Sequence, residues 1–170
     1  MDTIIYITPS FAVTGALAPE DFPKIAALGF RAIVSNRHDG EAEGQLTGRD
    51  EAVLAWRSGL SFRHVPVARD ELFTGPVVEG MADALNGLEG PVLAHCKSGL
   101  RSAVLWAAAS ARSGPVECVL EALQRAGFNP DALRHELEAQ ANRKRWLGQA
   151  RSLRCGEANA IPPPAQRAAA

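Results

Sequence analysis

The feature that most constrains the fold is an apolar run that ends in a short, glycine-containing loop. Residues 91–95, Pro-Val-Leu-Ala-His, contain almost no polar side chain. A half-exposed strand alternates polar and apolar residues, so a strand this apolar must be covered on both faces. The loop Cys-Lys-Ser-Gly and an apolar segment of helical character, 100–112, follow. The sequence here predicts a central strand, a tight loop and a helix.

Other strand-like and helix-like segments alternate along the chain. We expect strands at 3–7, 30–37 and 60–67, and helices at 18–30, 49–59, 77–88, 115–126 and 129–146. This alternation is typical of an α/β domain with a central, mostly parallel sheet flanked by helices. The 170 residues fit one such domain, which we place at 1–150. Residues 151–170 are predicted to be a disordered tail, because the Pro/Ala-rich end has no apolar period.

Charge and composition exclude several classes of function. A net charge of −1 lacks the basic excess of a nucleic-acid-binding protein. No stretch approaches the roughly 20 uncharged apolar residues of a membrane span, and the first residues lack the basic region of a signal peptide. Cys96, Cys118 and Cys155 form neither a disulfide framework nor a metal-ligand set. We therefore expect a cytoplasmic, reducing setting with no metal or organic cofactor, no nucleic-acid partner and no membrane partner.

The loop after residue 95 is suited to binding an anion. A strand–loop–helix unit directs backbone N–H groups and a helix N-terminus into one small space. Gly99 allows the loop a backbone angle closed to other residues. Arg101 supplies a planar fork that grips two oxygens at once. We therefore expect a small anionic substrate at this loop.

Cys96 is the predicted nucleophile, because positive surroundings stabilise a thiolate. Ser102 is placed to donate a hydrogen bond to its sulfur. The alternative is a buried cysteine that serves as a small hydrophobic residue beside a helix that starts with arginine. A nucleotide P-loop is excluded, since no Gly-Lys-Ser/Thr follows at the required spacing. The predicted substrate-binding residues are His95, Lys97, Ser98, Gly99, Leu100 and Ser102.

The segment His-Cys-Lys-Ser-Gly-Leu-Arg-Ser, 95–102, resembles the phosphate-binding signature of the cysteine-dependent tyrosine and dual-specificity phosphatases. From about Tyr6 to Trp146 the chain resembles the phosphatase-like domain of beta-lactamase hydrolase-like proteins, some of which are also labelled sulfur transferases. The resemblance implies a protein tyrosine phosphatase-like fold, with Cys96 as nucleophile and Arg101 as oxyanion binder. The matching stretches are 10–41, 62–67, 90–106 and 126–134.

One departure from the phosphatase pattern concerns the length of the loop. Phosphatases of the tyrosine class have five residues between the cysteine and the arginine, whereas this chain has four, from Lys97 to Leu100. Rhodanese-type sulfurtransferases use a comparably short loop, in which the cysteine carries a persulfide. Loop length therefore favours sulfur transfer, whereas His95 and Ser102 favour the phosphatase.

Phosphoester cleavage also needs a proton donor for the leaving oxygen. Asp70 and Glu71 are the natural candidates, because their loop follows the strand that ends at Val67 and emerges at the sheet edge of the cysteine loop. Asp70 is the predicted general acid. The alternative is that it caps or solvates an exposed loop.

Two further polar residues have structural interpretations. Arg37, near Glu41 and Glu43, lines the pocket rim or forms an ion pair; loop arginines beside acids usually pair, so we expect the ion pair. His64, on the strand at 60–67, is predicted to be a hydrogen-bonded core residue rather than a base.

Three functions follow from these expectations. The first is a phosphatase-like hydrolase with a covalent Cys96 intermediate, and the second is a sulfurtransferase that carries a persulfide on the same sulfur. The third is a non-catalytic anion-sensing or interaction module on this scaffold, for which the thiol would be unnecessary. The oligomeric state and the physiological substrate are not indicated by the sequence.

Overall fold

A five-stranded sheet organises the protein, whose computed structural model describes residues 3–145, without the side chains of residues 144 and 145. The strands are β1 (Ile5–Thr8), β2 (Phe11–Thr14), β3 (Ala32–Ser35), β4 (Ser61–His64) and β5 (Val92–His95). The helices are α1 (Asp21–Ala27), α2 (Gly48–Arg57), α3 (Gly75–Gly87), α4 (Leu100–Ala111), α5 (Val116–Arg125) and α6 (Arg134–Arg145), with short 3-10 turns η1 (Arg69–Glu71) and η2 (Asp131–Leu133).

The sheet is mostly parallel, as the sequence predicts. Its strand order is β1-β2-β5-β3-β4, and only β1 and β2 pair in antiparallel fashion. The central strand is β5, with Ala94 in register with Val13 of β2 and Val34 of β3. All four of its residues are buried, which confirms that this strand is covered on both faces.

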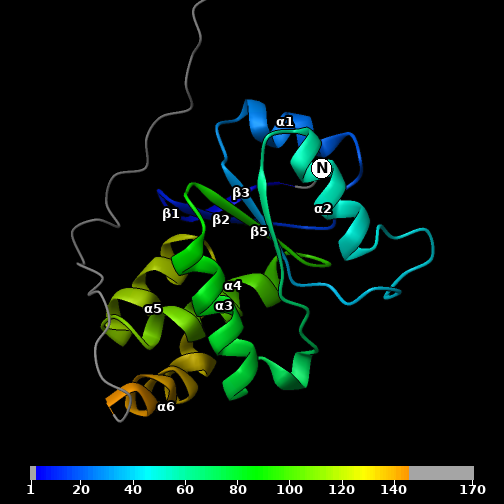
Figure 1. Ribbon diagram of the computed structural model, residues 1–170. Coiled ribbons are helices and arrows are strands. Elements are labelled where there is room, and N and C mark those ends of the chain that lie inside the picture. Colours follow the sequence, from blue (N-terminus) through cyan, green and yellow to red (C-terminus); the bar gives the residue numbers. More distant parts are fainter. Residues whose placement is uncertain (1–2, 146–170) are drawn as a thin grey trace, which may run out of the picture.

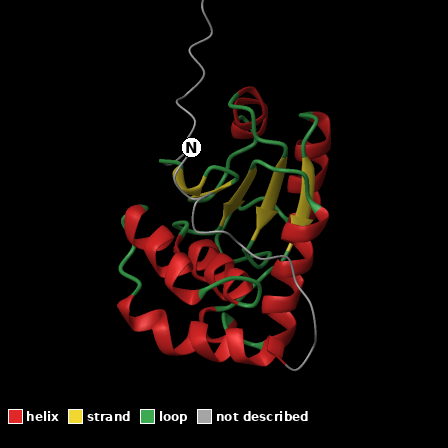
Figure 2. Ribbon diagram, turned by 90° about the vertical axis from the view of Figure 1, so that its left-hand side faces the viewer, coloured by secondary structure: helices red, strands yellow, loops and turns green. Residues whose placement is uncertain are grey.

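Two helical layers cover the sheet (Figures 1 and 2). Because successive strand side chains point to opposite faces, alternate residues of the strands belong to different cores. Ala12, Ile33 and Leu93 pack in one core with Phe22 and Ile25 of α1. The neighbouring strand residues pack in the other core against α3 to α6, with Val13, Val34 and Ala94 among them.

Helix α4 is the central helix of the second layer. All its residues from Ser102 to Ala111 are buried, and it packs against α3, α5 and α6. Leu105 is fully buried, and Trp106 stacks on Phe11 of β2 with ring centroids 5.6 Å apart. A buried strand and a buried helix therefore hold the two ends of the cysteine loop in fixed positions.

Three expectations need correction or qualification. Strand β2 was not predicted, because its four residues follow β1 through a tight Pro9-Ser10 turn and are too few to show a period. His64 is exposed on the edge strand rather than in the core. Cys118 on α5 is disulfide-bonded, which departs from the expectation of thiols in a reducing setting. Cys155 and the tail predicted to be disordered lie outside the described residues.

No helix within residues 3–145 is long and apolar enough to cross a membrane.

We predict that Leu93→Ala destabilises the domain by about 2–5 kcal/mol, because it opens a cavity in the middle of the sheet. Leu93 is fully buried in the central strand. The matched control is Leu28→Ala, since Leu28 is 57% exposed just after α1, and its cost should stay within about 0.5 kcal/mol. Urea unfolding followed by circular dichroism measures both changes. Equal losses for the two variants would contradict this description of the core.

Candidate functional site

The cysteine loop spans the gap between the carboxyl end of β5 and the first turn of α4. An isolated antiparallel β-bridge between Ser98 and Gly15 fastens the loop to the segment that follows β2. Gly99 adopts φ = 83°, a left-handed backbone angle that favours glycine. A Cβ atom at Gly99 would lie 3.3 Å from the carbonyl oxygen of Thr14. The glycine is therefore required both by the backbone angle and by the close approach of β2.

Cys96 lies at the base of this loop and is 1% exposed. Burial alone raises the pKa of the thiol, but hydrogen bonds from the backbone N–H groups of Ser102, Ser98 and Arg101 outweigh it, so the pKa is lowered below 9.0. Backbone amides of the loop thus converge on the sulfur and stabilise its negative charge. A stabilised thiolate is what a nucleophilic role would require, and that role of Cys96 stays a prediction.

The Ser102 hydroxyl contributes to the same charge stabilisation. Its proximity to the sulfur lowers the pKa of Cys96 further. The hydroxyl oxygen is buried and makes no hydrogen bond of ordinary geometry within the described part of the chain. It is therefore available to donate to the sulfur when the thiolate forms.

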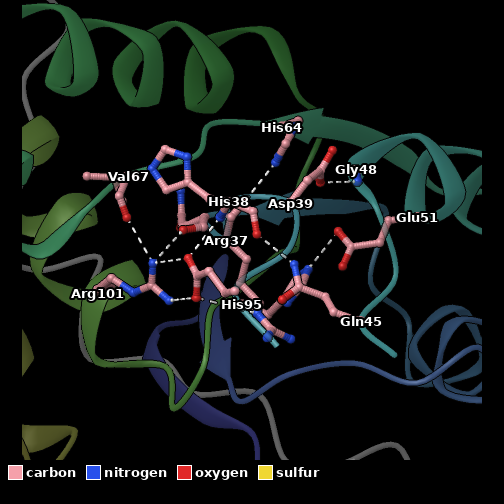
Figure 3. A network of polar contacts seen from close by, with 12 residues as sticks. Arg37, His38, Asp39, Gln45, Gly48, Glu51, His64, Val67, His95 and Arg101 are labelled. Carbon is pink, nitrogen blue, oxygen red and sulfur yellow. Dashed lines mark hydrogen bonds and ion pairs between the residues drawn. The ribbon is translucent and has the colours of Figure 1, made fainter. Parts of the chain in front are cut away.

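Arg101 is held by contacts from two other segments. Its two terminal nitrogens donate to the two carboxylate oxygens of Glu41, each at 2.6 Å. Nη1 also donates to the carbonyl oxygen of Val67 at 2.9 Å, a contact drawn in Figure 3. The guanidinium is therefore fixed before any substrate arrives.

A count of donors shows which edge of Arg101 remains open. A guanidinium has five N–H groups. The two hydrogens of Nη1 go to Glu41 and Val67, with the Asn36 carbonyl oxygen also 3.4 Å from Nη1, and one hydrogen of Nη2 goes to Glu41. The Nε hydrogen and the second Nη2 hydrogen remain, and they lie side by side on one edge of the group. The Cys96 sulfur interacts with the Arg101 side chain and helps to raise its pKa. The open fork can therefore hold two oxygens of an anion close to the sulfur.

The pairing also fixes the charge of Glu41. Hydrogen bonds from Arg101 lower the pKa of this carboxyl to about 2, against the opposing effect of burial and with help from the backbone N–H of His38. Glu41 in turn raises the pKa of Arg101. Both groups are therefore ionised across the neutral range, and Glu41 cannot supply a proton there.

A second polar cluster supports the loop from the α2 side. His95 is completely buried, and its Nε2 lies 3.2 Å from Oε2 of Glu51, which is 2% exposed (Figure 3).

His64 donates from Nε2 to the carbonyl oxygen of Arg37 at 2.7 Å. Arg37 is 7% exposed, with Nε 3.8 Å from Oε2 of Glu41, so the predicted ion pair is present.

A pocket of about 490 Å³ opens beside the loop. The predicted binding residues Lys97, Ser98 and Leu100 and the predicted catalytic residue Arg101 line it, together with Glu41, Arg69, Leu72 and Val104. The predicted residues His95, Cys96, Gly99 and Ser102 are buried and do not line it. Asp70 is exposed on η1, between the lining residues Arg69 and Leu72, and does not itself line the pocket.

The sequence pattern did not indicate the main partners of two site residues. Glu41 was assigned to Arg37, although its principal partner is Arg101, 60 residues away. Glu51 lies in the first turn of α2, where an acidic residue is ordinary, and nothing local marks it as the partner of His95. No group of three or more His, Cys, Asp or Glu side chains in the described ranges is arranged to hold a metal ion.

Replacement of Gly99 by alanine should disable the loop. The added Cβ meets the Thr14 carbonyl and strains the backbone, so we expect the affinity for phosphate to fall by about tenfold or more. The matched control is Gly127→Ala, since Gly127 has φ = 86° but nothing within 4 Å of the added atom. Calorimetric titration with phosphate should show the loss in the first variant alone. Equal affinities in the two variants would contradict the role of Gly99.

The Glu41–Arg101 pair should give a pH-dependent contribution to stability. The folded pKa of Glu41, about 2, lies below its usual 4.5, so the stabilisation is present above about pH 4.5 and is lost as the pH falls towards 2. Urea unfolding should show wild type more stable than Glu41→Gln at pH 7, with a difference that shrinks below pH 4.5. A difference that does not change with pH would contradict the pairing.

Comparisons with known proteins place this site in a family. Residues 3–113 match the model of the phosphatase-like domain of beta-lactamase hydrolase-like proteins. The beta-lactamase hydrolase-like protein of Agrobacterium fabrum is 30% identical over 113 residues, which are 66% of this chain and 26% of that protein. The chain thus spans about a quarter of this curated relative.

Solved structures agree with this assignment. A candidate phosphatase of Neisseria meningitidis Z2491 is 29% identical, with a TM-score of 0.67 over 81% of this chain and 97% of that one. The kinase-associated phosphatase, solved with its catalytic-site cysteine replaced by serine, has a TM-score of 0.61 at 15% identity, over 85% and 96% of the two chains, and shows the shared fold alone. The chain therefore belongs to the phosphatase-like domain family of beta-lactamase hydrolase-like proteins.

Proposed function

We propose that this protein is a cysteine-dependent phosphatase-like hydrolase that acts through a covalent intermediate on Cys96. The observation that carries the proposal is the open edge of Arg101 beside a thiol whose pKa is lowered by the loop amides. An oxyanion donor and a nucleophile thus meet at one point, and both are held in place before substrate binds. The proposed location is the cytoplasm, and the proposed substrate is a small phosphoester.

The proposed reaction has two displacements. The Cys96 thiolate attacks phosphorus, an S–P bond forms, and the P–O bond to the leaving group breaks. The loop amides and Arg101 hold the phosphoryl oxygens throughout. Water then attacks phosphorus and the S–P bond breaks, which releases inorganic phosphate and restores the thiolate. The leaving oxygen takes up one proton in the first step, and the attacking water gives up one in the second.

Asp70 is the proposed carrier of that proton. It lies on η1, three residues after Val67, whose carbonyl is bound to Arg101. Its neighbours Arg69 and Leu72 line the pocket, so the Asp70 carboxyl lies at the pocket's edge, and the proposal requires η1 to turn it towards the leaving group. An acid in this position contributes about 10²–10⁴ to the rate.

A specific observation favours sulfur transfer as a second candidate. The only carboxyl group that lines the described pocket is Glu41, which stays ionised with a pKa of about 2, and the loop has four residues rather than five. Sulfur transfer requires no general acid. In the thiosulfate reaction, Cys96 attacks the outer sulfur, the S–S bond breaks and sulfite leaves. Cyanide then takes the sulfur as thiocyanate and restores the thiolate.

The decisive experiment offers both substrates and identifies the adduct. The protein is incubated with p-nitrophenyl phosphate or with thiosulfate, and Cys96 is examined by mass spectrometry after rapid quenching. We expect a gain of a phosphoryl group from the ester, and no turnover in Cys96→Ser. A gain of one sulfur from thiosulfate, with no phosphoryl adduct, would replace the hydrolase by the sulfurtransferase. No adduct from either reagent would leave an anion-binding module.

Asp70→Asn separates the two enzymes further. We expect it to lower phosphatase kcat by about 10²-fold, because a carboxamide is too weak an acid to protonate the leaving oxygen. Any sulfur transfer should stay intact. The matched control is Asp83→Asn, since Asp83 is also exposed but lies on α3, away from this pocket. Steady-state kinetics with p-nitrophenyl phosphate measure both variants. Unchanged kcat in Asp70→Asn would exclude it as the acid.

A further inference from the structure

The pocket beside Cys96 is lined by more positive than negative side chains. Three cationic side chains line it, namely Arg69, Lys97 and Arg101, against the single carboxylate of Glu41. Glu41 is paired with Arg101, which it binds through both carboxylate oxygens. The charges of Arg69 and Lys97 are therefore not balanced by the lining of the pocket.

These two cations are also free of other partners. Neither Arg69 nor Lys97 makes a hydrogen bond or an ion pair with any residue in the part of the chain that the structure describes. By contrast, Arg37 and Arg112 are paired with carboxylates. Two unpaired cations at the mouth of one pocket provide a potential that favours an anionic group.

Both cations lie close to the reacting centre. Lys97 is the residue after Cys96, so their Cα atoms are about 3.8 Å apart. Arg69 lies two residues after Val67 in the chain. The carbonyl oxygen of Val67 is 2.9 Å from Nη1 of Arg101. Two residues of chain span at most about 7 Å. A second anion held by Arg69 and Lys97 would thus belong to the same small molecule as the first.

The apolar side chains that line the pocket indicate what carbon skeleton the bound molecule can have. Leu72, Leu100 and Val104 are aliphatic, and no aromatic side chain lines this pocket. A planar ring, as in an aryl ester, would find no stacking partner there. The apolar lining therefore suits a short aliphatic chain.

We infer that the substrate is a small aliphatic phosphoester with a second anionic group, a carboxylate or a phosphate, bound by Arg69 and Lys97. The inference rests on the proposed function for the identity of the first group. The second anion fixes the orientation of the ester, so that the scissile phosphate reaches the open edge of Arg101.

The test compares two esters that share a three-carbon skeleton. 3-Phosphoglycerate has a carboxylate where glycerol 3-phosphate has a hydroxymethyl group. We expect wild-type kcat/KM to be about tenfold or more higher for 3-phosphoglycerate, as one charge-assisted contact would give. In Arg69→Gln and in Lys97→Gln this ratio should fall by about tenfold. Arg57→Gln is the matched control, because Arg57 is an exposed arginine on α2, outside the pocket, and its ratio should equal that of wild type.

A binding measurement separates failure of the inference from failure of the proposed function. Hydrolysis of both esters at similar kcat/KM, or a preference that survives in both pocket variants, overturns the inference and leaves the hydrolase standing. If neither ester is hydrolysed, the p-nitrophenyl phosphate assay decides on the hydrolase, and calorimetry on Cys96→Ser decides on the second anion site. A Kd about tenfold lower for 3-phosphoglycerate, with the difference lost in Cys96→Ser/Arg69→Gln, supports the second anion site. Equal Kd values overturn it.

Discussion

The paired hydrogen bonds between Arg101 and Glu41 are the contact on which the site depends. They join the loop after β3 to the first turn of α4, and the Val67 carbonyl adds the segment after β4. Three stretches of chain that are distant in sequence are thereby fixed around one guanidinium. Preorganised donors need little reorganisation when charge develops on a substrate. The same contacts leave one edge of Arg101 open, and we propose that this edge binds an anion.

The scaffold explains how the cysteine loop keeps its shape. Strand β5 lies between β2 and β3, and α4 is buried along nearly its whole length, so both ends of the loop are fixed. Behind the loop, the buried His95–Glu51 contact connects it to α2. Sites on rigid elements hold their geometry better than sites on free loops. Side chains from η1 and its end, Arg69 and Leu72, and Glu41 from the loop before α2 line the pocket beside this fixed base.

Local patterns were sufficient to predict the core of this arrangement. The apolar run at 91–95 indicates a doubly covered strand, which the burial of β5 confirms. The Cys-Lys-Ser-Gly-Leu-Arg spacing predicts an anion loop at the end of that strand, and anion binding there stays a prediction. Strand β2 was missed because four residues show no period, and its identity as a strand comes from pairing with β5. The partners of Arg101 and His95 were missed for a related reason. Both are carboxylates more than 40 residues away, and only the folded chain brings them together.

The ionisation of Cys96 tests this account most directly. The thiolate absorbs in the ultraviolet, so a pH titration of wild type minus that of Cys96→Ser isolates one sulfur. The backbone amides, the Ser102 hydroxyl and Arg101 together predict a midpoint below 9.0, despite the burial of the thiol. A midpoint at or above 9.0 would mean that burial prevails over these donors. The loop would then hold an inert cysteine, and covalent catalysis at this site would be excluded.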